Sequence, residues 1–364
     1  MCDTSPFSSS PVLDALAASV VAEDTAPDAA VAWGRLRADG TWRVARGGSR
    51  RLFDLASVTK SFTAVAAALS GMGSATRLGL HLPELSTSAS GDASLAHLLS
   101  HRAGLEAHLE LFAPLRGGTL VDPGAALRQA ANARRPECAG IRPLEGFPVV
   151  YSDLGYLLAG AALARHVGTL DAGAAIEELL LQPLGLGAEL GTARSLGPLA
   201  DYAITETTTW RSPDPLRGIV HDENAFALTG RGGSGHAGLF GTAAAVVRFG
   251  LAVLQLLRGG GPLATGGPPP TWLVEPRPGS TWRAGFDGKS ATGSSAGASA
   301  SAASFGHLGF TGTSLWIDPV RSVVTCLTCN RVAPSRDRLP ASGGIRATRP
   351  RVHDALFRIA DEQA

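Results

Sequence analysis

The sequence predicts an α+β fold, in which both chain ends build one antiparallel sheet flanked by helices, with an all-helical domain inserted between them. Strand patterns lie near both termini, helical patterns fill the middle, and no internal repeat is evident. A chain of 364 residues fits one large domain or two closely associated ones. This order of elements indicates an α/β domain from residues 1–75 and 231–364, and a helical domain over 76–230.

The N-terminal segment predicts a helix, two strands and a second helix. Residues 10–23 favour a short amphipathic helix, with Ser10 as its N-cap and Pro11 at its first position. Two strands are expected around the turn at residues 38–41. An Ala- and Leu-rich helix follows, from Ser57 to about residue 70.

The rest of the chain alternates clear elements with loops. Residues 94–105 and 154–168 are the clearest helical segments of the middle, and each ends near a glycine. Residues 287–304 are low in complexity and bury too little apolar surface to order themselves, so we expect a mobile loop. Residues 304–319 and 321–332 predict two antiparallel strands, and a terminal helix closes the chain.

Composition excludes several classes of function. Lys plus Arg (32) nearly equals Asp plus Glu (31), which argues against a nucleic-acid-binding surface or an acidic tail. No run of 18 apolar residues predicts a transmembrane segment. The N-terminus lacks the pattern of a signal peptide, so we expect a cytoplasmic protein, or a periplasmic one if the start site is misassigned. The sequence leaves the oligomeric state open.

Cysteine and histidine spacings indicate no metal site or cofactor. Cys326 and Cys329 form C-x-x-C within an expected strand, where positions three apart point to opposite faces, so we expect core cysteines. His97 and His101 lack a third ligand and are expected to be structural. The glycine-rich matches at 233–238 and 293–297 lack the strand that a dinucleotide site or a nucleophile elbow requires.

Ser57 and Lys60 stand out in the apolar segment FDLASVTKSFTA. On a helix, residues three apart lie on one face with adjacent side chains. A serine hydroxyl is a poor nucleophile until a neighbouring base activates it, and a desolvated lysine amine can be that base. S-x-x-K alone is a weak signal, but two further motifs follow it: Tyr151-Ser152-Asp153 and His307-Leu308-Gly309.

These three motifs resemble those of the serine β-lactamase and penicillin-binding protein superfamily, specifically its class C-like hydrolases and esterases, over roughly residues 10 to 358. The resemblance implies a β-lactamase/transpeptidase-like fold with Ser57 as nucleophile, Lys60 as base and Tyr151 as proton relay. It also implies an oxyanion hole from the N–H groups of Ser57 and Phe310. Gly309 would let the strand edge approach the substrate.

Two residues depart from the family pattern, and a third is less certain. Asp153 replaces the amide of Y-x-N, and a carboxylate near Lys60 would favour the protonated amine. His307 stands where many relatives carry a lysine for the substrate carboxylate, and imidazole is only partly charged at neutral pH. Both changes argue against an efficient penicillinase. His236 is placed near the cleft by the resemblance, although packing or capping explains it equally well.

The sequence therefore predicts a serine hydrolase that forms an acyl-enzyme on Ser57 without metal or cofactor. Its substrate is expected to be a small molecule: an ester, an amide or a cell-wall-type peptide, with β-lactam hydrolysis as a side activity. Two alternatives remain open: a D-alanyl-D-alanine carboxypeptidase-type muropeptide hydrolase, and a non-catalytic homologue that binds or senses a ligand in the same pocket.

Overall fold

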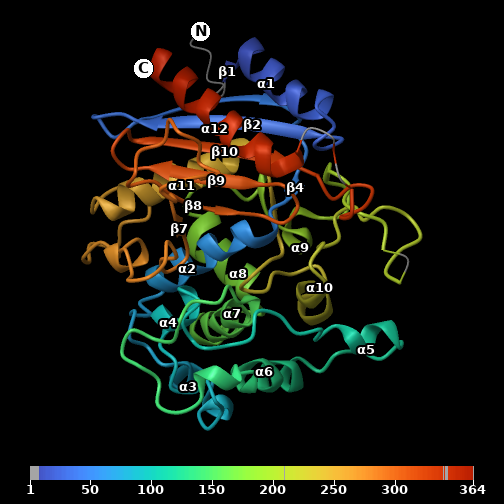
Figure 1. The fold of residues 1–364 in the computed structure, drawn as a ribbon, viewed down its shortest axis with the longest axis vertical. Coiled ribbons are helices and arrows are strands. Elements are labelled where there is room, and N and C mark those ends of the chain that lie inside the picture. Colours follow the sequence, from blue (N-terminus) through green and yellow to red (C-terminus); the bar gives the residue numbers. More distant parts are fainter. Residues whose placement is uncertain (1–7, 209, 339, 341–342, 364) are drawn as a thin grey trace.

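A seven-stranded sheet forms the upper part of the molecule in Figure 1, with the strand order β1-β3-β2-β10-β9-β8-β7. The computed structural model describes residues 8–208, 210–338, 340 and 343–363. The strands of this sheet are β1 (Ser8–Ser9), β2 (Ala29–Leu36), β3 (Trp42–Gly48), β7 (Asp287–Gly288), β8 (Phe305–Leu308), β9 (Ser314–Asp318) and β10 (Val323–Cys329). All pairings are antiparallel except β1 with β3, which is parallel.

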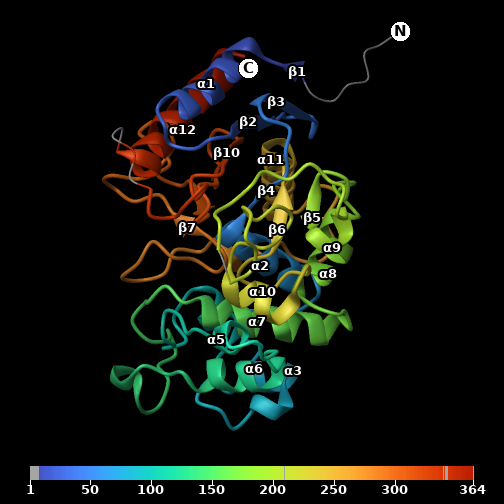
Figure 2. The ribbon, with the colours of Figure 1, turned by 90° about the vertical axis from the view of Figure 1, so that its right-hand side faces the viewer.

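Strands from the two chain ends meet at the centre of this sheet, where β2 pairs with β10. Two helices from opposite ends, α1 (Pro11–Ala22) and α12 (Gly344–Glu362), lie side by side on one face (Figures 1 and 2). Helix α11 (Ala243–Leu257) covers the other face. The predicted sheet built from both chain ends is confirmed.

The buried faces of the central strands follow the period of two that a strand imposes. In β10, Cys326 packs in the core beneath α11, whereas Cys329 packs in the core beneath α1 and α12. Both thiols are fully buried and free. Successive side chains on a strand alternate between faces, so residues three apart cannot share one. The prediction of core cysteines is confirmed.

The remaining helices mostly lie below the sheet in Figure 1, and several of them pack against α7. They are α2 (Thr59–Leu69), α3 (Leu78–His81), α4 (Leu95–Leu99), α5 (Ala113–Arg116), α6 (Pro123–Asn132), α7 (Asp153–Val167), α8 (Ala172–Ile176), α9 (Ala193–Leu196) and α10 (Glu223–Thr229). Single turns occur at η1 (Ala56–Val58), η2 (Pro83–Leu85), η3 (Pro136–Cys138), η4 (Glu177–Leu181) and η5 (Thr271–Leu273).

A second sheet has three strands in the order β4-β6-β5, and it combines strands from the segments 1–75 and 231–364 with one from the segment 76–230. Its strands are β4 (Phe53–Asp54), β5 (Leu190–Thr192) and β6 (Leu239–Gly241). Because β5 belongs to the segment 76–230, that segment is not helical throughout. The mixed fold class is confirmed, while the domain boundaries stay a prediction.

Two local predictions differ from the structure. The strand expected over 304–319 is a hairpin, because Gly309–Thr313 turn the chain between β8 and β9. The expected mobile loop at 287–304 packs on the protein: Ala296 and Ala300 are buried, and Ser301 donates to Asp318 at 2.8 Å. The premise that this segment cannot order itself is wrong, because buried backbone hydrogen bonds and small side chains suffice where the partner surface already exists.

Candidate active site

A strained turn between β4 and α2 presents Ser57. Ala56, just before it, has a φ of +45°, a conformation that non-glycine residues rarely adopt. The buried carboxylate of Asp54 holds the turn, because its two oxygens accept the N–H groups of Ala56 and His221, each at 2.8 Å. Strain of this kind persists only where surrounding contacts enforce it, and it is common at active sites.

The ammonium group of Lys60 lies at the centre of the site. Lys60 is fully buried, and its Nζ donates to Ser57 Oγ at 2.8 Å and to the carbonyl of His236 at 3.2 Å. Asp153 Oδ1 lies 2.7 Å from the same nitrogen. The structure therefore brings together Ser57, Lys60 and Asp153, as the sequence predicted for Ser57 and Lys60.

Charge around Lys60 keeps it protonated. Burial alone lowers the pKa of Lys60, but the carboxylate of Asp153, and then Tyr151, outweigh burial and raise it to about 12. Burial raises the pKa of Asp153, yet Lys60 lowers it far below its ordinary range. The expectation that Asp153 favours the lysine cation is thus confirmed by geometry and charge together.

Tyr151 completes the reacting group. Its hydroxyl lies near Ser57 and Lys60, and both groups influence its pKa. The ammonium also lies 5.1 Å from the centre of the Tyr151 ring. Burial raises the pKa of Tyr151, while Lys60 opposes that effect by favouring the phenolate. Tyr151 is therefore placed to exchange a proton with Ser57.

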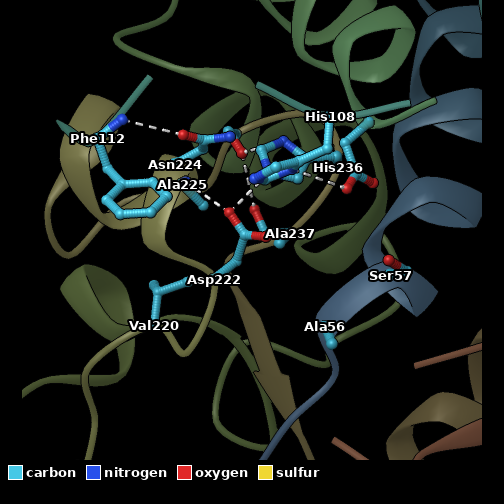
Figure 3. A network of polar contacts seen from close by, with 12 residues as sticks. Ala56, Ser57, His108, Phe112, Val220, Asp222, Asn224, Ala225, His236 and Ala237 are labelled. Atoms are coloured by element: carbon cyan, nitrogen blue, oxygen red, sulfur yellow. Dashed lines mark hydrogen bonds and ion pairs between the residues drawn. The ribbon is translucent and has the colours of Figure 1, made fainter. Parts of the chain in front are cut away.

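The imidazole ring of His236 contacts residues other than Ser57. Its Nε2 lies 2.8 Å from Asp222 Oδ1, its Nδ1 lies 2.9 Å from Ser234 Oγ, and the residue is 1% exposed (Figure 3). Its backbone carbonyl, and not its imidazole, contacts Lys60. These contacts favour the packing role for the His236 ring, and its substrate contact stays a prediction.

His307 does not provide the expected charge. It is 1% exposed, and it is absent from the residues that line the cleft. Burial, and then the nearby charge of Lys60, lowers the pKa of His307 to about 3. The expectation that His307 gains charge just below neutral pH is therefore wrong, because the sequence could not show how deeply the ring is buried.

Gly309 and Phe310 lie where β8 ends beside the nucleophile. A Cβ at Gly309 would come within 2.6 Å of the Leu55 carbonyl, so its lack of a side chain lets the strand end pack against the Ser57 turn. Phe310 is 48% exposed and lines the cleft, with the Arg331 guanidinium 4.4 Å from its ring centre. Contact of either residue with substrate stays a prediction.

The cleft in front of Ser57 has a volume of about 880 Å³. Carboxylates of Asp153, Asp222 and Glu223 line one part of it, together with His108. Arginines line another part: Arg331, Arg336, Arg338, Arg346 and Arg349. Several of these guanidiniums already have partners; Arg336 binds Glu206 and Glu223, and Arg349 donates to the carbonyls of Gly309 and Thr313. The volume lies within the range of small-molecule pockets in proteins.

Sequence reasoning missed several residues of the site. His108 Nδ1 lies 3.8 Å from Asp153 Oδ2, and that contact raises the pKa of His108. Asp222 caps α10 through the N–H of Ala225 at 2.8 Å and holds His236. The signal for Asp54 was available, since an isolated carboxylate in the apolar run before Ser57 calls for a buried partner.

Comparison with known proteins agrees with this geometry. The sequence model of the Beta-lactamase family matches residues 16–348. The chain belongs to the Beta-lactamase family. An Escherichia coli K12 relative, named "Putative D-alanyl-D-alanine carboxypeptidase", is 29% identical over an alignment of 217 residues, and the match covers 52% of this chain and 47% of the relative. The match thus spans about half the length of that family member.

Solved structures show the same fold. The hydrolase EstCE1, described as having promiscuous acyltransferase activity, superposes with a TM-score of 0.65 at 18% identity, covering 95% of this chain and 97% of its own. A β-lactamase/D-alanine carboxypeptidase from Pseudomonas syringae gives 0.64 at 16% identity, covering 96% and 99%. A class C β-lactamase from Rhodobacter sphaeroides gives 0.63 at 17% identity, covering 98% and 100%.

The family match assigns the chain to its family, and these neighbours share its fold. Among the helices of the described residues, none is both long enough and apolar enough to cross a membrane.

Proposed function

We propose that this family member is a serine hydrolase that forms an acyl-enzyme on Ser57 with the help of Lys60 and Tyr151. The observation that carries the proposal is the 2.8 Å hydrogen bond from Lys60 Nζ to Ser57 Oγ at the edge of an open cleft of about 880 Å³. A buried ammonium that donates to a serine at the edge of a cleft lowers the energy of the alkoxide that attacks a substrate.

The proton path follows from the charges. Lys60 is protonated at neutral pH, so it donates to Ser57 and cannot take the serine proton in the resting enzyme. The reacting form of the enzyme carries Tyr151 as a phenolate beside the Lys60 ammonium, and Tyr151 Oη takes the serine proton as Ser57 Oγ bonds to the substrate carbonyl carbon. Tyr151 then gives the proton to the leaving alkoxide or amine as the bond to it breaks. Water attacks the acyl-enzyme by the same route in reverse, which releases the acid and restores the Ser57 hydroxyl.

The N–H groups of Ser57 and Phe310 are the proposed oxyanion hole. Both residues line the cleft at the place where β8 ends beside the Ser57 turn. Preorganised donors of this kind contribute about 3 kcal/mol each to the transition state. This assignment rests on the family resemblance and on the proximity of the two segments.

A small ester, amide or cell-wall-type peptide is the proposed substrate class. The second candidate is a D-alanyl-D-alanine carboxypeptidase-type activity, which the name of the E. coli relative favours. Exposed Arg346 in the cleft adds support, because a guanidinium suits a terminal carboxylate. Weak β-lactam hydrolysis is compatible with the site, but Asp153 and the neutral His307 argue against an efficient penicillinase.

Covalent labelling tests the mechanism. Intact mass spectrometry after incubation with a fluorophosphonate, and separately with a penicillin, should show one adduct per chain. Ser57→Ala should abolish the adduct and nearly all p-nitrophenyl ester turnover, whereas the matched Ser295→Ala in the rejected 293–297 motif should change neither. Labelling and turnover that survive Ser57→Ala would refute the proposal. A ligand that binds wild type without any adduct would identify a non-catalytic binding protein instead.

A further inference from the structure

His101 lies directly after α4, in a backbone conformation that suits a different residue. It follows the Ser100 C-cap with a φ of +60°, and two hydrogen bonds close the helix end: His101 N–H to Leu98 O, and Arg102 N–H to His97 O. This is a Schellman ending, whose left-handed position usually holds glycine or asparagine. The left-handed conformation is strained for a residue with a Cβ, so the side chain needs a reason to be present.

That reason lies in the segment that carries Tyr151. The backbone carbonyl of His101 accepts the N–H of Val150 at 3.3 Å. Its Nδ1 accepts the N–H of Ser152 at 3.0 Å. One residue thus binds the peptide N–H groups on both sides of Tyr151. Its ring also packs on the tyrosine ring, with the centres 4.5 Å apart.

We propose that His101 is a positioning residue for catalysis, which holds the Tyr151 side chain beside Ser57 by binding the N–H groups of Val150 and Ser152, the residues on either side of the tyrosine. The inference rests on the proposed function, since it gives Tyr151 the role of proton carrier. His101 does not touch substrate; it is 3% exposed and is absent from the residues lining the cleft.

The chemistry of the ring fits this role. A nitrogen that accepts a hydrogen bond carries no proton, so the Ser152 contact requires neutral His101 with its proton on Nε2. Burial, and then the charge of Lys60, lowers the pKa of His101 well below its ordinary value, although Asp153 opposes this. The contact therefore persists across the range in which the enzyme works.

Two substitutions separate the acceptor from the backbone conformation. Asparagine and glycine both adopt the left-handed conformation readily, and both keep the carbonyl contact to Val150. Asparagine Oδ1 can replace Nδ1 as acceptor for Ser152, and glycine cannot. We expect His101→Asn to keep kcat within about threefold of wild type, and His101→Gly to lower kcat more than about tenfold with KM nearly unchanged. His97→Asn, within α4, is the control and should leave kcat unchanged.

Coupling to the tyrosine gives the decisive measurement. In a Tyr151→Phe background, which lacks the hydroxyl, the difference between His101→Asn and His101→Gly should disappear. His101→Ser, too short to reach Ser152, replaces the glycine variant if that variant does not fold. Equal kcat for the acceptor and non-acceptor variants, or an unchanged difference without the hydroxyl, would overturn the proposal.

Crystal structures of the variants test the positioning independently of turnover. The Tyr151 hydroxyl should superpose on wild type in His101→Asn and should be displaced in His101→Gly. An undisplaced tyrosine in both variants would overturn the inference. If turnover proves independent of Ser57, the proposed function fails, and the tyrosine position still decides the role of His101.

Discussion

Replacing Asp153 by asparagine should move the basic limb of the pH–rate profile to lower pH. The Asp153 carboxylate lies 2.7 Å from Lys60 Nζ, and the pKa of the lysine is about 12 instead of 10.5. That difference corresponds to roughly 2 kcal/mol in favour of the ammonium. Burial acts in the opposite direction, so removal of the carboxylate should lower the pKa of Lys60.

The basic limb should move to lower pH whether Lys60 or Tyr151 accepts the proton. Loss of the negative charge favours neutral Lys60, and it equally favours the Tyr151 phenolate, since Asp153 also raises the pKa of the tyrosine. The assay is kcat/KM for a p-nitrophenyl ester from about pH 6 to 11, with the spontaneous rate subtracted. We expect the midpoint of the basic limb to fall by more than about one pH unit in Asp153→Asn.

Stability provides a second readout with a definite sign. Lys60 has a raised pKa, so its contribution to the free energy of unfolding is complete below pH 10.5 and is lost as the pH rises through about 12. Asp153 has a lowered pKa, so its contribution is present above its ordinary value of 3.8 and is lost in acid. Both contribute at pH 7, and breaking such a buried pair costs about 3 kcal/mol. Asp153→Asn should therefore lower the Tm at neutral pH.

Asp122→Asn is the matched control, because that side chain is 68% exposed and its helix-capping contact is one that asparagine also makes. It should change neither the profile nor the Tm. A folded Asp153→Asn with the wild-type pH profile would refute the coupling between Asp153 and the proton transfer.

Three further predictions follow from individual contacts. His307→Lys should lower the Tm and gain no preference for anionic esters, because it buries a second cation near Lys60; a stable variant with that preference would contradict the burial argument. Deleting residues 290–302 should lower the Tm by more than about 5 °C, since it removes buried Ala296 and Ala300; an unchanged melting curve would show that this packing is weak. Gly309→Ala should lower kcat about tenfold or more with a smaller effect on Tm, because its Cβ would displace the Leu55 carbonyl, now 2.6 Å from the Cβ position; full activity would mean that the Ser57 turn tolerates the shift.

Sequence reasoning succeeded where the pattern was local. The start of α1 at Pro11, the two strands around residues 38–41, and the helix after Ser57 all appear in the structure. It failed at 304–319, because the glycines and threonines of 309–313, which form the turn, were interpreted as part of one strand. It also failed at 287–304, because composition measures what a segment can bury by itself and does not reveal a surface elsewhere in the chain that receives it.

The sequence by itself determined the relation between Ser57 and Lys60, since three residues on a helical turn place two side chains together in any protein. It also determined the opposite faces of Cys326 and Cys329, because strand geometry is equally local. Only the tertiary structure decided that Asp153 pairs with Lys60, that His307 is buried and neutral, and that His101 binds the peptides on both sides of Tyr151. Each of these depends on segments distant in sequence and on burial, and a side chain's pKa and partners are set by that environment and not by its neighbours along the chain.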